Sequence, residues 1–205
     1  MSCAIKLAAL LDEANLPPLT ERQSELFDHY LGLFLKWNEK TNLSAVRDED
    51  EILRRHILES IACAHALPAG LTTLLDFGSG GGFPGIPIAI LHPQIHITLA
   101  ESQIKKAAFL AETVRSLQFN CKVHSARAEL LRAEFDCVTL RAVDKMTNAV
   151  KAASRLIKDH GWLTLMTTTR EMAAHQSAAG SDFQWQKPVA LYASDSRIIL
   201  IGQRL

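Results

Sequence analysis

The sequence predicts an α/β fold: a mostly parallel, doubly wound sheet with helices on both faces, preceded by a helical N-terminal extension. Three observations predict it. From residue 71 onward, short apolar runs alternate with longer amphipathic stretches, as in successive strand–helix units. A glycine-rich loop over 78–85 joins the first of these strands to a helix. Before residue 70, apolar residues recur with helical spacing.

Three helices are expected in the N-terminal segment. They cover residues 1–16, 20–38 and 49–67. The second opens on a capping-box pattern, Thr20 with Gln23, and Asp48 can cap the third. Pro68 and Gly70 stop the third helix. We therefore divide the chain into a helical cap, residues 1–70, and one compact domain, residues 71–205.

The second part of the chain is predicted to alternate strands and helices. The strands cover 72–77, 95–100, 121–124, 135–140 and 161–167, and the helices 85–91, 103–118, 145–158 and about 170–179. The tail differs, because two apolar strands, 185–192 and 197–202, are joined by only four residues. This spacing predicts an antiparallel hairpin at the edge of the sheet.

Composition narrows the class of protein. The chain has 205 residues, 48% of them hydrophobic and 21% charged, as in globular proteins that contain a substantial core. The net charge of +0 gives no overall attraction to nucleic acid, although a local basic patch can bind RNA. Scattered cysteines fit a reducing cytoplasm and predict no metal site; they are Cys3, Cys63, Cys121 and Cys137. The apolar stretch Leu7 to Leu11 is too short for a signal peptide or a membrane span.

The glycine loop fits two cofactor patterns. Gly80 to Gly85 matches G-x-G-x-x-G, the dinucleotide fingerprint, whereas Asp76 to Gly82 matches D-x-G-x-G-x-G, with Gly78, Gly80 and Gly82 as its glycines. A dinucleotide brings a pyrophosphate, which helix N-terminal N–H groups bind. S-adenosylmethionine (SAM) instead brings a sulfonium and an ammonium, which the carboxylate of Asp76 suits. The loop therefore favours SAM, and an NAD-dependent oxidoreductase is the alternative.

Further cofactor contacts are expected at the ends of later strands. Glu101 ends the second strand, where a carboxylate accepts hydrogen bonds from ribose hydroxyls; the alternative is a carboxylate at a helix start. A backbone N–H near Ala128 or Glu129 is placed to hold the adenine edge, or the segment is a simple exposed turn. Arg141 follows the fourth predicted strand and is expected to point into the mouth of the site.

The target atom is expected to be nucleophilic without losing a proton. The chain lacks an N-P-P-Y motif after the fourth strand and has no Pro-Cys pair for attack on a pyrimidine. Guanine N7 has an in-plane lone pair, so methylating it requires positioning rather than a general base. An arginine bonded to N7 would block attack, and we therefore expect Arg141 to contact O6 of the base or the cofactor carboxylate.

The N-terminal segment carries several basic residues: Lys36, Lys40, Arg47, Arg54, Arg55 and His56. Acidic residues are interleaved with them, notably over 48–51, so charge alone predicts a solvated face. His56 lies beside Ile52 and Ile57 on the predicted helix, and its default interpretation is a half-buried structural histidine.

Five groups of residues, taken in chain order, resemble one family. They are Lys36-Trp37-Asn38 with Asn42-Leu43, Arg55 to Ser60, Gly78 to Pro87, Arg127-Ala128-Glu129 and Arg141-Ala142. The family is RsmG, formerly glucose-inhibited division protein B, SAM-dependent methyltransferases that act on guanine N7 in the decoding region of 16S rRNA, at guanosine 527 in standard rRNA numbering. The resemblance implies the class I methyltransferase fold, a monomer, and 16S rRNA or the small ribosomal subunit as partner.

The resemblance also implies roles for individual residues. Gly78, Phe83, the backbone at Ala128 and Glu129, and Arg141 are implied to contact SAM, and Arg55 and His56 to lie near the catalytic cleft. The basic cap is then expected to face RNA. The chain departs from the family pattern at three positions, with Glu59 for the usual Asp, Asp144 for a small residue and Thr167 for a lysine. The missing lysine keeps an inactive SAM- or RNA-binding module as a second alternative.

Overall fold

A computed structural model describes residues 3–205 of the chain, with side chains from Ala4 onward. The start of the helix predicted over 1–16 and the side chain of Cys3 lie outside this range. The N-terminal helices are α1 (Cys3–Glu13), α2 (Glu21–Thr41), α3 (Glu49–Ile52) and α4 (Glu59–Ala66). Those that follow are α5 (Gly85–Leu91), α6 (Ile104–Ser116), α7 (Met146–Ala153) and α8 (Met172–Ala179).

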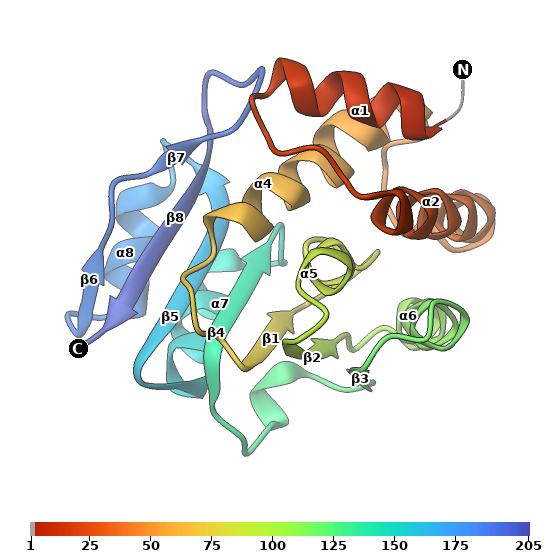
Figure 1. Ribbon diagram of the computed structural model, residues 1–205. Helices are drawn as coiled ribbons and strands as arrows, with labels where there is room; N and C mark the ends of the chain where they lie inside the picture. Colours follow the sequence, from red (N-terminus) through yellow and green to blue (C-terminus); the bar gives the residue numbers. More distant parts are fainter. Residues whose placement is uncertain (1–2) are drawn as a thin grey trace.

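One eight-stranded sheet forms the centre of the molecule (Figure 1). Its strands are β1 (Thr73–Phe77), β2 (His96–Ala100), β3 (Cys121–His124), β4 (Phe135–Arg141), β5 (Ile157–Thr168), β6 (Phe183–Trp185), β7 (Val189–Ala190) and β8 (Arg197–Arg204). The order is β3-β2-β1-β4-β5-β8-β6, with β7 also paired to β8. The pairs from β3 to β5 are parallel and those of β8 are antiparallel. The order in which successive strands are added to the sheet therefore reverses between β1 and β4, and ligands bind at such a point in sheets of this kind.

Helices cover both faces of the sheet, as the alternating pattern predicted. The N-terminal helices share a hydrophobic core with α5, α6 and one sheet face, to which Tyr30, Phe34 and Phe109 each contribute a fully buried ring. On the other face, α7 and α8 pack over a second core that includes Val150 and Ala179. The predicted cap thus buries its apolar side directly against the sheet.

The predicted hairpin is present but interrupted. Its second strand, β8, lies between β5 and β6 rather than at the edge. The run predicted as one strand over 185–192 is split into β6 and β7. Pro188 stands between them and has no N–H to donate to a ladder, which accounts for the break. Strand β5 begins at Ile157, earlier than predicted, because helix α7 ends at Ala153 in a short 3₁₀ turn.

The helix predicted over 49–67 is continuous from Glu49 to Ala66, but residues Leu53–Leu58 form a π-helical segment within it. Such segments contain one residue more than an α-helix of the same length and occur often at functional sites. Asp48 caps the helix as predicted, through a bond from the N–H of Glu51 to its carboxylate (2.9 Å). The capping box of Thr20 and Gln23 is also present.

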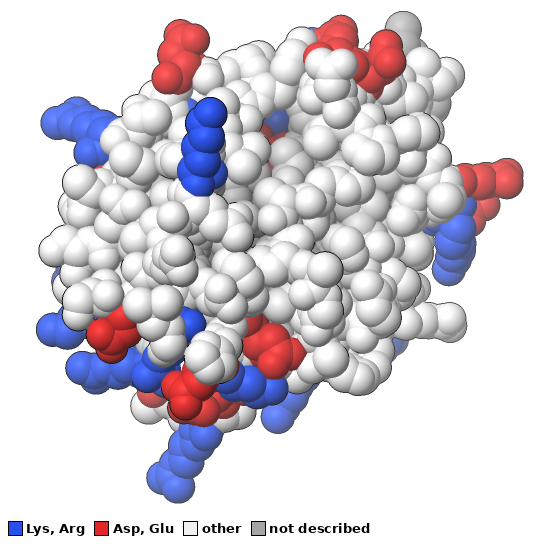
Figure 2. Space-filling model, turned by 60° about the vertical axis from the view of Figure 1, so that its left-hand side comes forward, with Lys and Arg blue, Asp and Glu red and all other residues white. Residues whose placement is uncertain are grey.

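Charged side chains of both signs mix along the lower edge of the face shown in Figure 2, and much of the rest of that face is uncharged. This mixture agrees with the net charge of +0. No helix among the described residues is long and apolar enough to cross a bilayer.

Candidate active site

The glycine loop is held against the ends of two strands. The N–H groups of Gly78 and Ser79 both donate to the carbonyl oxygen of Ala100, at 2.9 Å each. Gly78 has a φ of +75°, and a Cβ built on it would lie 2.9 Å from Cγ2 of Val143, in the segment after β4. Both facts make a side chain at this position unfavourable. The loop therefore packs closely against the segment after β4, and no side chain of Gly78 fills the neighbouring cavity.

Glu101 organises the same loop from the end of β2. Its Oε2 accepts a hydrogen bond from the N–H of Gly80 (3.0 Å) and its Oε1 one from the N–H of Gln103 (2.7 Å). The residue is only 7% exposed, and what remains exposed faces a cavity. Each carboxylate oxygen still has a lone pair to offer a ligand there.

A cavity of about 560 Å³ lies beyond the carboxyl ends of the parallel strands. Gly78, Glu101, Ala128 and Glu129, all predicted to contact the cofactor, come together in its wall. Its other lining residues are Phe77, Ala100, Ser102, Gln103, Ala126, Arg127, Val143, Asp144, Lys145, Asn148 and Ala149. Many carry hydrogen-bonding groups, so the wall suits a polar ligand with an apolar ring, such as a nucleoside.

Asp76 has an additional role that the sequence analysis did not anticipate. Its carboxylate accepts hydrogen bonds from the N–H of Gly85 (3.2 Å) and the hydroxyl of Thr139 (3.0 Å), so it holds the start of α5 against β4. The residue is 1% exposed and is not part of the cavity wall. Burial raises the pKa of Asp76 to about 6. Its predicted contact with the cofactor stays a prediction.

The remaining loop residues predicted to contact the cofactor also pack away from this cavity. A Cβ on Gly82 would lie 2.7 Å from Ile86 and 2.9 Å from the hydroxyl of Tyr30. Phe83 is 7% exposed, and the centroid of its ring lies 4.9 Å from that of His56. Phe83 therefore supports the residues around Arg141, whose guanidinium carbon lies 6.0 Å from the centroid of the phenyl ring. Its contact with the cofactor likewise stays a prediction.

Arg141 is the centre of a hydrogen-bonded network. Its Nη2 donates to the carbonyl oxygen of Arg55 (2.5 Å), to Nδ1 of His56 (3.0 Å) and to Oε2 of Glu59 (3.3 Å). No protein acceptor among the described residues bonds its Nε or Nη1. The arginine is thus fixed by one nitrogen and presents its remaining donors to a ligand.

The partners of His56 define its protonation state. A guanidinium only donates, so Nδ1 is the acceptor, and the ring proton is on Nε2, which donates to the hydroxyl of Ser44 (2.7 Å). Burial, together with the charge of Arg141, lowers the pKa of His56 to about 3. The imidazole is therefore neutral, with both nitrogens engaged, and it positions Arg141 rather than accepting a proton.

Glu59 joins segments that are far apart in the sequence. Its carboxylate is 4% exposed and accepts from Arg141 and, through Oε1, from Nε of Arg197 at 2.6 Å. Arg197, at the start of β8, belongs to no sequence motif and so was not predicted to be part of the site. Only the fold places it beside Glu59, 138 positions away.

A second cavity of about 330 Å³ is lined in part by Arg141. Its lining residues are Arg55, Glu59, Arg141, Ala142, Val143, Met146, Met166, Thr167, Thr168, Glu171, His175, Leu191 and Arg197. Val143 lines both cavities, so the two adjoin at this residue. Thr167, which replaces the lysine implied by the resemblance, bonds through Oγ1 to Nδ1 of His175 (2.9 Å).

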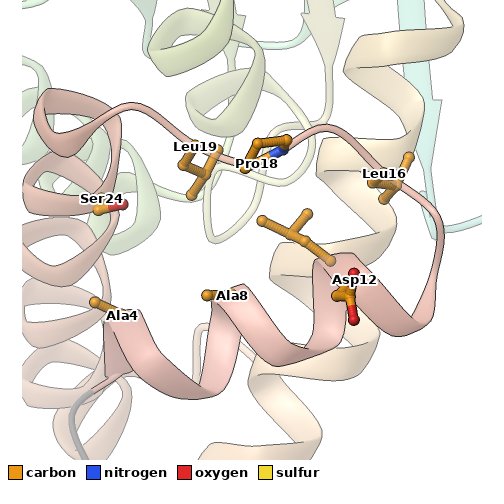
Figure 3. A pocket seen from close by; sticks show the side chains of 8 residues that line it. Ala4, Ala8, Asp12, Leu16, Pro18, Leu19 and Ser24 are labelled. Carbon is orange, nitrogen blue, oxygen red and sulfur yellow. The ribbon is translucent and has the colours of Figure 1, made fainter.

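Another hollow lies apart from this edge of the sheet. Figure 3 shows a largely apolar pocket of about 210 Å³ between α1, the connection through Leu16, Pro18 and Leu19, and Ser24 of α2. It holds none of the predicted site residues. Among the described residues, no group of three or more His, Cys, Asp or Glu is arranged to hold a metal ion.

Comparison with known proteins identifies the family. A family model described as rRNA small subunit methyltransferase G (GidB) matches residues 23–197. The chain belongs to this family. The family's curated relatives include a ribosomal RNA small subunit methyltransferase G of Xanthomonas euvesicatoria, 39% identical over 76% of this chain and 73% of the relative. The Chromobacterium violaceum protein of that name is 41% identical over 72% of each chain. The Roseiflexus castenholzii protein is 43% identical over 65% of this chain, and the match spans 60% of its length.

Solved structures of methyltransferases share the fold. Mitomycin 7-O-methyltransferase MmcR superposes with a TM-score of 0.63 at 15% identity, covering 97% of this chain and 73% of that one. A predicted O-methyltransferase of Agrobacterium tumefaciens gives 0.60 at 18% identity, over 71% and 80% of the two chains. These identities support the fold alone, and they confirm the predicted class I methyltransferase architecture.

Proposed function

We propose that this protein transfers a methyl group from SAM to N7 of a guanosine in 16S rRNA, leaving S-adenosylhomocysteine. Family membership supports an rRNA methyltransferase of the small subunit, since its curated relatives carry that name. The observation that carries the proposal is the pair of adjoining cavities, which meet at Val143 beside Arg141. A methyltransferase requires two such sites, one for the donor and one for the acceptor, within reach of each other.

The larger cavity fits SAM. Gly78 brings no side chain, so the backbone can approach a ligand closely, and Glu101 offers carboxylate oxygens to ribose hydroxyls. The wall at Ala128 and Glu129 offers backbone groups to an adenine edge. Asp144 lines the same cavity and adds a carboxylate, which suits an ammonium or a sulfonium.

The smaller cavity is proposed to hold the target base. Bound SAM supplies a methyl group on a sulfonium, which an in-plane lone pair such as that of guanine N7 takes without losing a proton. The neutral, fully bonded His56 agrees with a reaction that requires no general base there. Arg141 lines this cavity, and its unused donors would hold O6 of the base or the cofactor carboxylate, so its proposed role is positioning and electrostatic.

The helical cap is proposed to face the RNA. The acidic residues that interleave its basic ones are partly engaged elsewhere, because Lys6 of α1 pairs with Glu49 (3.3 Å) and Asp50 (2.7 Å). Arg54 and Arg55 are exposed, and Arg55 lines the smaller cavity.

The test is methyl transfer from labelled SAM to small ribosomal subunits and to 16S rRNA, both from a strain that lacks the gene. We expect incorporation of one methyl group per RNA, mapped to one guanosine by cleavage specific for 7-methylguanine. Calorimetric titration with SAM and with NAD is the control for the cofactor. Binding of NAD but not SAM, or SAM binding without incorporation into either substrate, would refute the proposal.

A further inference from the structure

A third cavity, of about 150 Å³, opens beside the active-site cavity of about 330 Å³. Arginines form much of its polar wall: Arg54 and Arg55 from the π-helical segment, and Arg197 from the start of β8. The other lining residues are Glu51, Leu58, Tyr192 and Ala193. Arg55 and Arg197 line both cavities, so the two adjoin. We name this cavity the arginine pocket.

Most of the charge in the arginine pocket is free to act on a ligand. Among the described residues, no carboxylate lies within ion-pair distance of Arg54 or Arg55. Arg197 uses Nε for Glu59 (2.6 Å), and no protein acceptor in the described part of the chain bonds its two terminal nitrogens. Two arginines without an ion-pair partner, together with Arg197, whose charge Glu59 partly offsets, stand against one lining carboxylate, that of Glu51. The pocket therefore has an excess of positive charge and several unused N–H donors.

The walls of the arginine pocket are fixed by contacts outside it. The carbonyl oxygen of Arg55 accepts from Arg141, which ties the π-helical segment to β4. Tyr192 also lines the pocket, and its hydroxyl donates to the carboxylate of Glu13 in α1 (2.9 Å). Three distant parts of the chain are thereby held in place before any ligand arrives, which lowers the entropic cost of binding.

We propose that the arginine pocket binds a phosphodiester group of the RNA, next to the nucleotide whose base enters the active site. Arginine matches phosphate oxygens with two parallel N–H donors, and three arginines around one small cavity suit a compact anion. The inference rests on the proposed function, because the adjoining cavity is assigned to the base only there. When a base occupies that cavity, one sugar separates it from the backbone phosphate of its nucleotide. The arginine pocket adjoins the cavity at Arg55 and Arg197, so it is near enough to receive that phosphate.

The test compares Arg54→Gln with Arg115→Gln, a matched control that removes one exposed arginine from α6, across the molecule from β8 (Figure 1). Equilibrium binding of a 16S rRNA transcript is measured from about 50 to 200 mM salt. We expect Arg54→Gln to weaken binding three- to tenfold at the lowest salt. We also expect it to reduce the slope of log affinity against log salt by about 0.7–0.9, the loss of one phosphate contact. Arg54→Lys should restore most of the slope.

Equal slopes for wild type and Arg54→Gln would overturn the phosphate assignment, as would equal losses in the two glutamine variants or no binding by wild type. Binding requires no turnover, so this result is independent of the proposed function. Wild type that binds the transcript with the expected dependence on Arg54, but methylates neither rRNA nor subunits, would refute the proposed function and retain the pocket as an RNA phosphate site. Unfolding midpoints of all variants report any loss of folding.

Discussion

The contact between Gly78 and Val143 allows a quantitative test of how the loop shapes the active site. Ala at position 78 would have a φ of +75°, which costs an L-residue roughly 1–2 kcal/mol. Its Cβ would also lie 2.9 Å from Cγ2 of Val143, and overpacking of this kind adds about 1–3 kcal/mol. We therefore expect Gly78→Ala to lower the free energy of unfolding by roughly 2–5 kcal/mol, the sum of those two ranges.

Gly70→Ala is the matched control. Gly70 has a φ of +82°, but nothing lies within 4 Å of a Cβ built on it, so only the conformational cost of about 1–2 kcal/mol applies. Val143→Ala should relieve the contact, and a double-mutant cycle should then give a favourable coupling of about 1–2 kcal/mol between positions 78 and 143. Because Val143 lines both cavities, the displaced side chain in Gly78→Ala should also weaken SAM binding.

The assay is urea unfolding of the single and double variants, with SAM affinity measured by calorimetry. The reasoning fails if Gly78→Ala is no less stable than Gly70→Ala, or if the coupling between positions 78 and 143 is zero within about 0.3 kcal/mol. Either result would mean that the loop adjusts without pressing on Val143.

Three further predictions concern the charged groups around the site. Arg141→Ala should reduce methyl transfer per folded molecule at least tenfold, because it removes hydrogen-bond donors that no other residue replaces. Turnover equal to that of wild type, after correction for unfolded protein, would contradict a role of Arg141 in the active site. The pKa of His56 is about 3 in the folded protein and about 6.5 in the unfolded chain, so stability should fall as the pH drops below 6.5. Between pH 7.5 and 5, wild type should lose roughly 2 kcal/mol more unfolding free energy than His56→Gln. Parallel plots of unfolding free energy against pH for the two proteins, from denaturant titrations, would refute this. The pH dependence of stability due to Asp76 has the opposite sign, because burial raises the pKa of this carboxyl from 3.8 to about 6 and only the folded state keeps the proton between these values. Relative to Asp76→Asn, wild type should lose roughly 2 kcal/mol of unfolding free energy as the pH rises from 4 to 6.5. A gain in stability would show that the carboxylate is stabilised when ionised.

Local signals predicted most of the fold. The capping box at Thr20 and the cap at Asp48 are present, and the strands from β1 to β4 lie where apolar runs placed them. These features depend on neighbouring residues, which a sequence displays directly. The early start of β5 was missed, because the sequence does not show that α7 ends at Ala153, and the break before β7 was missed although Pro188 marks it in the sequence.

The candidate site was predictable only in part. Glu101 and Arg141 follow strands that run parallel, so their positions at one edge of the sheet follow from the topology. The contact of Arg197 with Glu59 does not, since it links the start of β8 to a helix near the N-terminus. Nor does the sequence reveal that Asp76 holds Gly85, because a carboxylate at a strand end looks the same whether it faces a ligand or the protein.

The π-helical segment makes helix length a determinant of the site. Residues Leu53–Leu58 contain one residue more than regular α-helical winding would place there. Removing any one of them would restore that winding and leave the two flanking parts of the helix in nearly the same relative orientation, because the extra residue is accommodated within the widened turn. Glu59 would then stay near its two arginines, whereas side chains within the segment, among them Arg54 and Arg55 of the arginine pocket, would move around the helix axis. A one-residue deletion here should therefore act mainly on the arginine pocket, and gaps in this helix between homologous proteins should mark differences in how their RNA is held.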